Sequence, residues 1–443
     1  MSIAAPVVIV GGGWAGLSTA IELSQYKIPV TLIESNQQLG GRGRTITIDD
    51  MEIDNGQHLL IGAYSETLRL LKLMGQQESD LFDRQPTLLQ CRTHRLPGFR
   101  LSLPRIAAPL NFLLGLLSAK GFSIKEKTAI IKLCLILNRC NFSIDQDKSL
   151  LAWLAQNGQT EKIIQQFWQP LCLAMLNTPI DIASSEVFLR VLKDSFTLQR
   201  DYSDFLFARH NIGLLFPQPA QHYLDKNGTT LMTGQRVETV ESTTGQTTGT
   251  DFIVHTNKCS IKAQHVVLAV PPKQCLRLIK NISALIPLQK QLRRFKTSPI
   301  TTVYLRYAKN ISLNQDMLGI SGGQLQWLVD RSSSDQAGII AGIISGPGSH
   351  MELSKEALAQ KAVAEITTLF PHWPKPLHVS VVREKRATFL CETGVNEYRP
   401  NNKTALPNLW LAGDHTDTGY PSTLEGAVRS GVACAKKILQ DIK

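Results

Sequence analysis

Three glycines near the N-terminus have the spacing that brings a protein backbone close to a phosphate group. Gly11, Gly13 and Gly16 form a G-x-G-x-x-G pattern directly after a short apolar segment, Val7–Val10. In this pattern the first glycine permits a tight turn and the second lets the backbone approach a pyrophosphate. The third allows a helix to pack closely on a strand. The pattern therefore predicts pyrophosphate binding at the N-terminus of a helix.

A carboxylate follows at the distance expected for contact with a ribose. Residues 17–23 have the apolar spacing of a helix, and Val30–Ile33 is a second apolar segment that ends on Glu34. Glu34 stands 18 residues after Gly16, where an acidic side chain accepts hydrogen bonds from a ribose 2′-hydroxyl. The order strand, glycine loop, helix, strand, acid predicts a dinucleotide-binding βαβ unit. Its predicted binding residues are Gly11, Gly12, Gly13, Ala15, Gly16 and Glu34.

A second glycine loop, rich in arginine, follows the acid. Residues 39–45 read Leu-Gly-Gly-Arg-Gly-Arg-Thr and include Gly41, Arg42 and Arg44. Glycine again allows close approach of the backbone, and guanidinium groups bind phosphate oxygens in a planar, bidentate manner. Domains that bind NAD do not need this loop, so the sequence favours another dinucleotide.

A third segment that combines an apolar run, a glycine and the start of a helix lies near the C-terminus. Residues 408–414 form an apolar segment that ends in Gly-Asp, and residues 423–426 open the last helical segment. A helix N-terminus carries partial positive charge and stabilises negative charge placed against it. The positions predicted to face the ligand are Gly413, Asp414, Thr423, Leu424 and Gly426.

Together the three segments resemble the two-dinucleotide-binding flavoproteins, which include the amine oxidases, protoporphyrinogen oxidase and the phytoene desaturase group. The resemblance implies FAD as the cofactor, since motifs from both ends of the chain must meet on one ligand. It implies that Asp414 bonds the ribityl–pyrophosphate part of FAD and that residues 423–426 face the N1–O2 edge of the flavin. It also implies that the backbone at Val237 lies against the adenine. The Thr/Gly-rich residues 239–251 are expected to form a hairpin tip.

The same resemblance predicts an α/β fold in which a Rossmann-type FAD-binding domain carries an inserted α+β substrate domain. The FAD-binding domain is predicted to consist of residues 1–65, 210–272 and 395–443. Residues 66–209 and 273–394 are predicted to form the substrate domain.

Hydrophobic periodicity gives some elements of this substrate domain. Residues 187–196 and 355–369 have helical spacing, whereas residues 300–307 and 339–345 have the composition of buried strands. Strands covered by helices, with wide insertions, suit a bulky apolar ligand.

Composition and charge narrow the range of partners. The chain has 443 residues, 43% of them hydrophobic and 19% charged, which fits a folded protein of two or three sub-domains. Its eight cysteines form no C-x-x-C pair, so reduced thiols in a cytoplasmic protein are expected, without a metal site. The net charge is +11, but no basic run contains interleaved aromatics, so nucleic acid is not expected. An anionic membrane surface is the expected partner, with the protein peripheral on the inner face of the membrane.

One apolar stretch has two interpretations. Residues 103–122 are apolar, with Arg105 and Lys120 near the ends. Their apolar centre is too short to span a bilayer, and it contains Pro109 and Gly115. The stretch is either a buried helix of the substrate domain or an interfacial element through which a lipid substrate enters.

Residues 54–58, Asp-Asn-Gly-Gln-His, follow a predicted strand. In the flavoproteins that the chain resembles, this position runs beside the isoalloxazine ring. The resemblance therefore implies that Gly56, Gln57 and His58 lie against the flavin, while Asp54 fixes the loop.

One branch of these flavoproteins resembles the chain in two further stretches. They are residues 54–64, DNGQHLLIGAY, and residues 297–300, Thr-Ser-Pro-Ile. The branch is the squalene-associated FAD-dependent desaturase-like family, the hydroxysqualene dehydroxylases of bacterial hopanoid synthesis. The resemblance implies a lipophilic isoprenoid substrate, hydroxysqualene, which loses water to give an allylic cation. Hydride from reduced FAD then gives squalene.

Such a reaction needs a group that protonates the departing hydroxyl. The candidates are His58, Tyr420 and Asp54, in that order. Tyr420 and Tyr398 are expected to line the flavin face, where aromatic rings can stabilise a carbocation. The alternative for His58 is a purely structural role, and for the tyrosines it is core packing. The sequence does not identify the electron donor, because it contains no second G-x-G-x-x-G pattern for NADPH.

Three other functions stay open. A carotenoid-type desaturase has the same fold and substrate class, but hydride moves to FAD instead of away from it. An amine oxidase is less favoured, because residues 298–303 lack the lysine that many amine oxidases hold near flavin N5. A flavin-stabilised, non-enzymatic partner of an isoprenoid synthase is the third alternative.

Overall fold

A parallel sheet of five strands gathers segments from the beginning, middle and end of the chain. The computed structural model describes residues 7–93, 98–244 and 250–442, and its strand order in this sheet is β10-β2-β1-β14-β20. The strands are β1 Val7–Val10, β2 Val30–Ile33, β10 Thr230–Met232, β14 His265–Leu268 and β20 Leu409–Leu411. All neighbouring pairs are parallel. The carboxyl ends of the five strands therefore lie at one edge, where loops from distant parts of the sequence meet.

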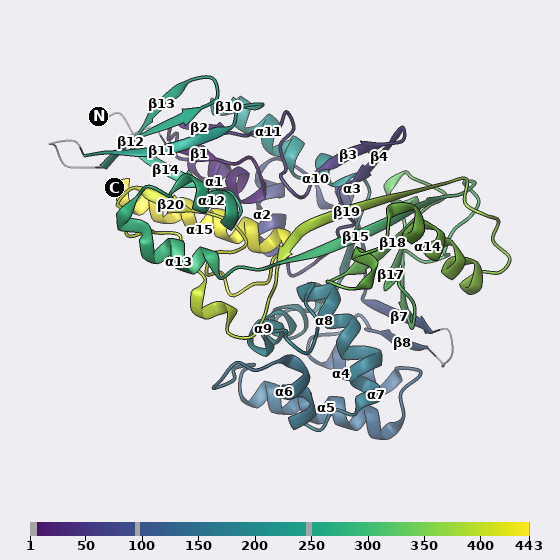
Figure 1. Cartoon of the computed structure of the whole chain (residues 1–443). Helices are drawn as coiled ribbons and strands as arrows, with labels where there is room; N and C mark the ends of the chain where they lie inside the picture. The colour runs from purple at the N-terminus through teal and green to yellow at the C-terminus, as the bar shows by residue number, and fades with distance from the viewer. Residues whose placement is uncertain (1–6, 94–97, 245–249, 443) are drawn as a thin grey trace.

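Two long helices from opposite ends of the chain pack beside this sheet. They are α1 (Trp14–Ser24) and α15 (Leu424–Ile442), which lie next to each other in Figure 1. Every residue of α1 is buried, and the Thr19 hydroxyl lies 3.2 Å from the carbonyl oxygen of Gly431 in α15. A parallel sheet covered by helices, with the glycine loop between β1 and α1, is the Rossmann-type arrangement.

A small antiparallel sheet adjoins the parallel one. It consists of β11 (Val237–Thr244), β12 (Thr250–Thr256) and β13 (Ser260–Ala263). The strands β11 and β12 pair as expected for a hairpin. The tip is shorter than predicted, because residues 239–244 and 250–251 belong to the paired strands; residues 245–249 lie outside the described residues.

A mixed sheet of seven strands dominates the other half of the molecule. Its order is β19-β15-β18-β17-β16-β7-β8. The strands are β7 Leu88–Thr93, β8 Phe99–Ser102, β15 Thr297–Arg306, β16 Met317–Ser321, β17 Trp327–Asp330, β18 Ile339–Ser345 and β19 His378–Phe389. Figure 1 shows the two longest, β15 and β19, running from the neighbourhood of α15 to that of α14 (Lys355–Leu369). These strands therefore connect the two halves of the molecule.

Helices between residues 110 and 196 gather below this sheet in Figure 1. They are α4 Leu110–Ser118, α5 Ile124–Arg139, α6 Leu150–Gln156, α7 Glu161–Ile163, α8 Gln169–Leu176 and α9 Ser185–Phe196. Aromatic and aliphatic side chains form their common core, in which Phe167 contacts Trp168 edge to face. The sheet and these helices form the α+β part of the fold.

The remaining elements connect these layers. The strands are β3 Thr45–Ile48, β4 Met51–Asp54, β5 Leu60–Ile61, β6 Phe82–Gln85 and β9 Phe205–Ala208. The helices are α2 Ser65–Leu73, α3 Glu78–Leu81, α10 Ile212–Leu215, α11 Pro217–Lys226, α12 Pro272–Leu278 and α13 Ile286–Arg293.

The predicted elements are present, with differences at their ends. The bounds of β1, β2, β18 and α14 are as predicted, because a short apolar run or helical spacing marks both ends of each. Helix α1 begins at Trp14, three residues before the prediction, because Gly13 is its N-cap residue and the helix starts inside the glycine loop.

Candidate active site

A cavity of about 1120 Å³ opens where the carboxyl ends of the parallel strands meet the seven-stranded sheet. The glycine loop, the arginine loop and the start of α15 all contribute to its lining. The predicted site residues in the lining are Gly11, Gly13, Ala15, Glu34, Gly41, Arg42, Arg44, Gly56, Gln57, His58, Gly413, Asp414, Tyr420, Thr423 and Leu424. Most of the site predicted from three distant segments is thus brought together around one space.

The glycine loop leaves a helix N-terminus open to this cavity. Gly11 has a φ of +111°, and a Cβ atom there would lie 2.4 Å from the carbonyl oxygen of Ala269. A Cβ atom on Gly16 would lie 2.0 Å from the carbonyl oxygen of Gly11, so this glycine is required within the loop itself. No side chain caps α1, and Gly13 and Ala15 line the cavity. Backbone N–H groups at this end are therefore available to an anionic ligand.

Glu34 lines the cavity and fixes the glycine loop. Its carboxylate accepts hydrogen bonds from the backbone N–H of Gly12 at 2.8 Å and of Asn36 at 2.8 Å. The Ser35 hydroxyl lies 3.0 Å from the same carboxylate. Gly12 contributes through this contact and lies outside the cavity lining. Because a carboxylate can accept further hydrogen bonds, Glu34 can still bind a ribose hydroxyl.

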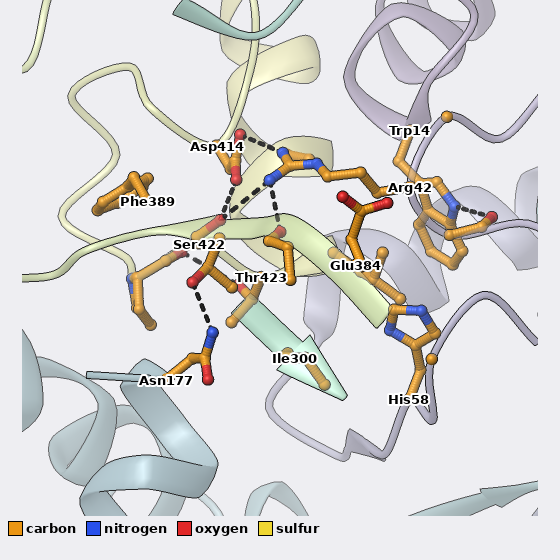
Figure 2. Close-up of a pocket in the computed structure, with 18 of the residues that line it drawn as sticks. Trp14, Arg42, His58, Asn177, Ile300, Glu384, Phe389, Asp414, Ser422 and Thr423 are labelled. Carbon is orange, nitrogen blue, oxygen red and sulfur yellow. Dashed lines mark hydrogen bonds and ion pairs between the residues drawn. The ribbon is translucent and has the colours of Figure 1, made fainter. Parts of the chain in front are cut away.

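The arginine loop and the C-terminal Gly-Asp meet in an ion pair. Arg42 Nη2 lies 2.7 Å from Asp414 Oδ1, and Arg42 Nη1 donates to the carbonyl oxygen of Ala387 at 2.7 Å. Figure 2 shows Arg42 reaching toward Asp414 and Ser422. Burial opposes ionisation of Asp414, but Arg42, His415 and the Ser422 hydroxyl outweigh burial and lower the pKa of this carboxyl. Asp414 is therefore a charged acceptor at the cavity wall.

The first turn of α15 points into the same space. The Thr423 hydroxyl accepts a hydrogen bond from the backbone N–H of Gly426 at 3.0 Å, so it caps the helix. Thr423 and Leu424 line the cavity, whereas Gly426 lies behind them in the helix. Glu425 turns away and accepts hydrogen bonds from the backbone and hydroxyl of Thr67.

Asp54 lies outside the cavity lining, in contrast to the other four residues of the loop 54–58. Its carboxylate accepts hydrogen bonds at 2.7 Å from the backbone N–H of Ile212 and from Arg331 Nη1. Arg331 is 1% exposed, and it also donates to Gln57 Oε1 at 2.8 Å. This buried ion pair holds the loop of residues 54–58 against the cavity. We therefore treat Asp54 as a positioning residue and no longer favour it as a proton donor.

Two histidines, the half-buried His58 and the buried His415, line the cavity with ring nitrogens that lack partners. Within the described residues, Nε2 of His58 and both ring nitrogens of His415 have no hydrogen-bond partner. Burial lowers the pKa of His58, with Arg331 and Arg42 reinforcing the shift and Asp54 opposing it. Burial likewise lowers the pKa of His415 to about 4, against the effect of Asp414. Neutral, unpartnered imidazoles in a cavity wall fit a site that a polar ligand completes.

Tyr420 is hydrogen-bonded to Asp194, a carboxylate that the sequence motifs do not predict as a site residue. Its hydroxyl donates to Asp194 of α9, and the guanidinium of Arg429 lies 4.1 Å from the centre of its ring. Both Tyr420 and Asp194 line the cavity and are buried. One feature of the sequence could have identified Asp194 as a functional residue. It is a charged residue on the buried face of α9, and that face is otherwise largely apolar.

Two other predicted positions lie outside the lining. Val237 is buried in the core of the small antiparallel sheet, and its carbonyl oxygen accepts a hydrogen bond from Arg277 at 2.9 Å. Its contact with adenine stays a prediction. Tyr398 packs against Phe295, and its hydroxyl lies 3.4 Å from Glu392. Because Tyr398 lies outside the cavity lining, its contact with the flavin face stays a prediction.

The part of the cavity beneath the seven-stranded sheet is mostly apolar. Its lining includes Leu171, Met175, Val191, Phe205, Ile300, Met317, Trp327, Val329, Ile343, Val382 and Phe389. Asn177 lines this part and contacts β15, β19 and the residue after β18. Its amide nitrogen donates to the Pro299 carbonyl oxygen at 3.2 Å and to the Thr388 hydroxyl at 2.9 Å, and its amide oxygen accepts from Gly346 N–H at 2.7 Å. A polar, arginine-rich part thus continues into an apolar part, with Tyr420 and Asp194 among the polar groups of the lining.

Comparisons with known proteins agree with this arrangement. The family model described as flavin containing amine oxidoreductase matches residues 14–439. The chain belongs to this family. FAD is therefore its cofactor, and the glycine loop, the arginine loop, Asp414 and the start of α15 provide a site that fits it. As a flavin-containing amine oxidoreductase in the broad sense, the chain is an FAD-dependent oxidoreductase.

Three similar proteins illustrate the range of activities among the proteins that resemble the chain. Hydroxysqualene dehydroxylase from Rhodopseudomonas palustris is 26% identical over 97% of both chains. Zeta-carotene desaturase from Synechocystis sp. is 24% identical over 98% of this chain and 97% of that protein. Cyclohexylamine oxidase from Brevibacterium oxydans has the same fold, with a TM-score of 0.72 at 15% identity over 99% of both chains.

Proposed function

We propose that the protein reduces hydroxysqualene to squalene. The observation that carries this proposal is the apolar cavity that continues from the FAD site and has a buried tyrosine–carboxylate pair in its wall. An apolar wall suits a long hydrocarbon, and a proton-bearing pair suits the loss of a hydroxyl group. The similarity to hydroxysqualene dehydroxylases along nearly the whole chain supports the same substrate.

The chemistry makes different demands on each part of the site. Reduced FAD, when bound, supplies the hydride that forms the new C–H bond. Apolar side chains such as Ile300, Met317 and Trp327 exclude water, which would otherwise capture an allylic cation. The ring of Tyr420 already contacts the guanidinium of Arg429, 4.1 Å from the ring centre, so we do not assign this ring to stabilising the carbocation.

The departing hydroxyl group must take up a proton before it leaves as water. We assign this proton to Tyr420, whose hydroxyl is oriented by the Asp194 carboxylate, and water restores the proton between turnovers. His58 is a weaker candidate than the sequence indicates, because the lowered pKa leaves its imidazole neutral near pH 7. A neutral imidazole can still orient a hydroxyl group through a hydrogen bond, and we keep this role for His58.

A carotenoid-type desaturase is the second candidate function. The specific observation that favours it is the similarity to zeta-carotene desaturases, which is as extensive as that to the dehydroxylases. In that reaction hydride moves from the substrate to oxidised FAD, and the apolar cavity serves equally well. The proton-bearing pair of Tyr420 and Asp194 is what favours dehydroxylation.

We further propose that the substrate enters from an anionic membrane through the surface of α4 and α5, defined as residues 100–139. Eight exposed large hydrophobic side chains lie between residues 106 and 136. The surface also carries seven lysines and arginines, whereas its one acid, Glu126, is ion-paired with Lys162 at 3.0 Å. Apolar side chains surrounded by basic ones are typical of interfacial membrane binding. Among the described residues, the structure has no helix long and apolar enough to cross a membrane.

The direct test is to incubate the reduced holoenzyme anaerobically with hydroxysqualene and to identify the product by mass spectrometry. We expect squalene, together with stoichiometric oxidation of the bound flavin. In a parallel reaction, the oxidised holoenzyme is mixed with ζ-carotene. Reduction of the flavin in that reaction, with no squalene in the first, would replace dehydroxylation by desaturation.

A further inference from the structure

A strongly basic surface adjoins the cavity. Residues 271–297, which include α12 and α13, contain seven lysines and arginines and no acidic residue. All seven basic side chains are exposed. We call this segment the α12–α13 surface. Such a concentration of one charge on a chain of ordinary charge content needs a physical explanation.

The α12–α13 surface is largely unneutralised. Lys296 lies 3.0 Å from Glu392, and Arg294 lies 3.9 Å from Glu397. Within the described part of the chain, the other five basic side chains of the segment have no carboxylate within 4.0 Å. The surface therefore presents a positive potential to solvent.

This surface also reaches the cavity. Lys273, Arg293 and Lys296 line the cavity and are exposed, as is Arg386 of β19. Every exposed charged side chain in the lining is basic. Immediately inside, the ring of Phe295 lies 5.9 Å from that of His415, the neighbour of Asp414. The opening thus leads directly to residues that the flavin site uses.

The composition of the α12–α13 surface argues against a lipid partner. Among the described residues, Ile286 is its one exposed large hydrophobic residue, whereas the α4–α5 surface has eight. Figure 1 shows α13 beside α15, well away from α4 and α5. A membrane bound at α4 and α5 therefore leaves the α12–α13 surface free.

We infer that the α12–α13 surface docks an acidic electron-carrier protein that reduces the bound flavin. The direction of electron flow rests on the proposed function. Each turnover breaks one C–O bond and forms one C–H bond, and the substrate gains two electrons and two protons and releases water. The carrier, a protein with its own flavin or iron–sulfur centre, loses the two electrons, and solvent supplies the protons. Complementary charge accelerates such encounters by factors of about 10–1,000 at low ionic strength.

The test measures flavin reduction without any isoprenoid substrate, so it does not depend on the proposed reaction. Oxidised holoenzyme is mixed in a stopped-flow instrument with an acidic flavodoxin kept reduced, and the flavin absorbance is followed. The variant is Lys280→Glu with Lys290→Glu, because both residues are exposed and neither lines the cavity. The matched control is Lys361→Glu with Lys375→Glu, which reverses two exposed charges elsewhere. A neutral reductant, 1-benzyl-1,4-dihydronicotinamide, tests whether the flavin site is intact.

We expect the variant to slow reduction by flavodoxin about tenfold at low ionic strength, and the difference should shrink as salt is added. The control should match the unmodified protein, and all three should react equally with the neutral reductant. Equal flavodoxin rates in variant and control would overturn the inference. The inference would also be overturned if the Lys280→Glu/Lys290→Glu variant kept the flavodoxin rate of the unmodified protein but lost reduction by NADPH or binding to anionic vesicles.

Discussion

At the scale of single residues, Tyr420 and Asp194 are separated by 226 positions in the chain and joined by one hydrogen bond. Buried carboxylates persist where hydrogen bonds and cations satisfy them, and Asp194 has Tyr420, Arg190 at 3.3 Å and Arg429 at 3.9 Å. The surrounding charges therefore hold Asp194 in place as the acceptor that orients the Tyr420 hydroxyl.

Tyr420→Phe removes the hydroxyl group that carries the transferable proton and leaves the volume of the side chain almost unchanged. We expect turnover of hydroxysqualene to fall by about 10²–10⁴-fold, the usual contribution of a general acid, while FAD remains bound. Tyr398→Phe is the matched control, because it removes a buried tyrosine hydroxyl outside the cavity lining. Steady-state kinetics and the flavin absorbance of both variants give the comparison. Equal turnover in the two would exclude Tyr420 as the proton donor.

Glu34 and Asp414 make a second residue-scale prediction. Each is a buried carboxylate in the wall of the FAD site. Loss of a hydrogen bond to a charged group costs about 1.5–3 kcal/mol, so Glu34→Ala or Asp414→Ala should weaken FAD binding roughly 10- to 150-fold. Flavin retention on dialysis and titration of the apoprotein measure the change. Glu352→Ala, on an exposed carboxylate, should bind FAD normally. Undiminished affinity in both cavity variants would refute the assigned contacts.

At the scale of elements, the sequence predicts the helices and strands that local hydrophobic periodicity marks, and the binding loops that glycine spacing marks. The bounds of β1, β2 and α14 follow from burial on one face or both. The site residues found in this way are those in motifs, such as Glu34 and Asp414. Arg331 and Asp194 were missed, because their roles come from contacts with Asp54 and Tyr420 across 277 and 226 positions. Such contacts depend on how sheets and helices pack, which local pattern does not specify.

Helix α4 carries the element-scale prediction. Leu114 and Leu117 are 47% and 52% exposed, so replacing both by glutamine should leave the fold unchanged. We expect the unmodified protein to sediment with vesicles of phosphatidylglycerol and phosphatidylethanolamine at low salt, and the double variant to remain largely in the supernatant. Leu377→Gln, at a residue that is 70% exposed elsewhere, is the control. Equal sedimentation of both variants would show that α4 does not contact the membrane.

At the scale of the whole molecule, one cavity combines a polar part and an apolar part. The parallel sheet and the two glycine-rich loops hold FAD, and the apolar part beneath the seven-stranded sheet suits a hydrocarbon. We assign substrate entry to the α4–α5 surface and electron delivery to the α12–α13 surface. The predicted division into FAD-binding and substrate domains remains a prediction, although strands from its three FAD-binding segments do share one sheet.

The central claim is that hydride moves from the flavin to the carbon that loses its hydroxyl group. Because the hydrogen on flavin N5 exchanges with water, the apoprotein is reconstituted with reduced 5-deaza-FAD carrying deuterium at C5, which does not exchange. After anaerobic reaction with hydroxysqualene, the account predicts squalene with one deuterium at the former carbinol carbon, seen by mass spectrometry and NMR. Squalene without deuterium, or no squalene from an enzyme that instead oxidises ζ-carotene, would contradict it.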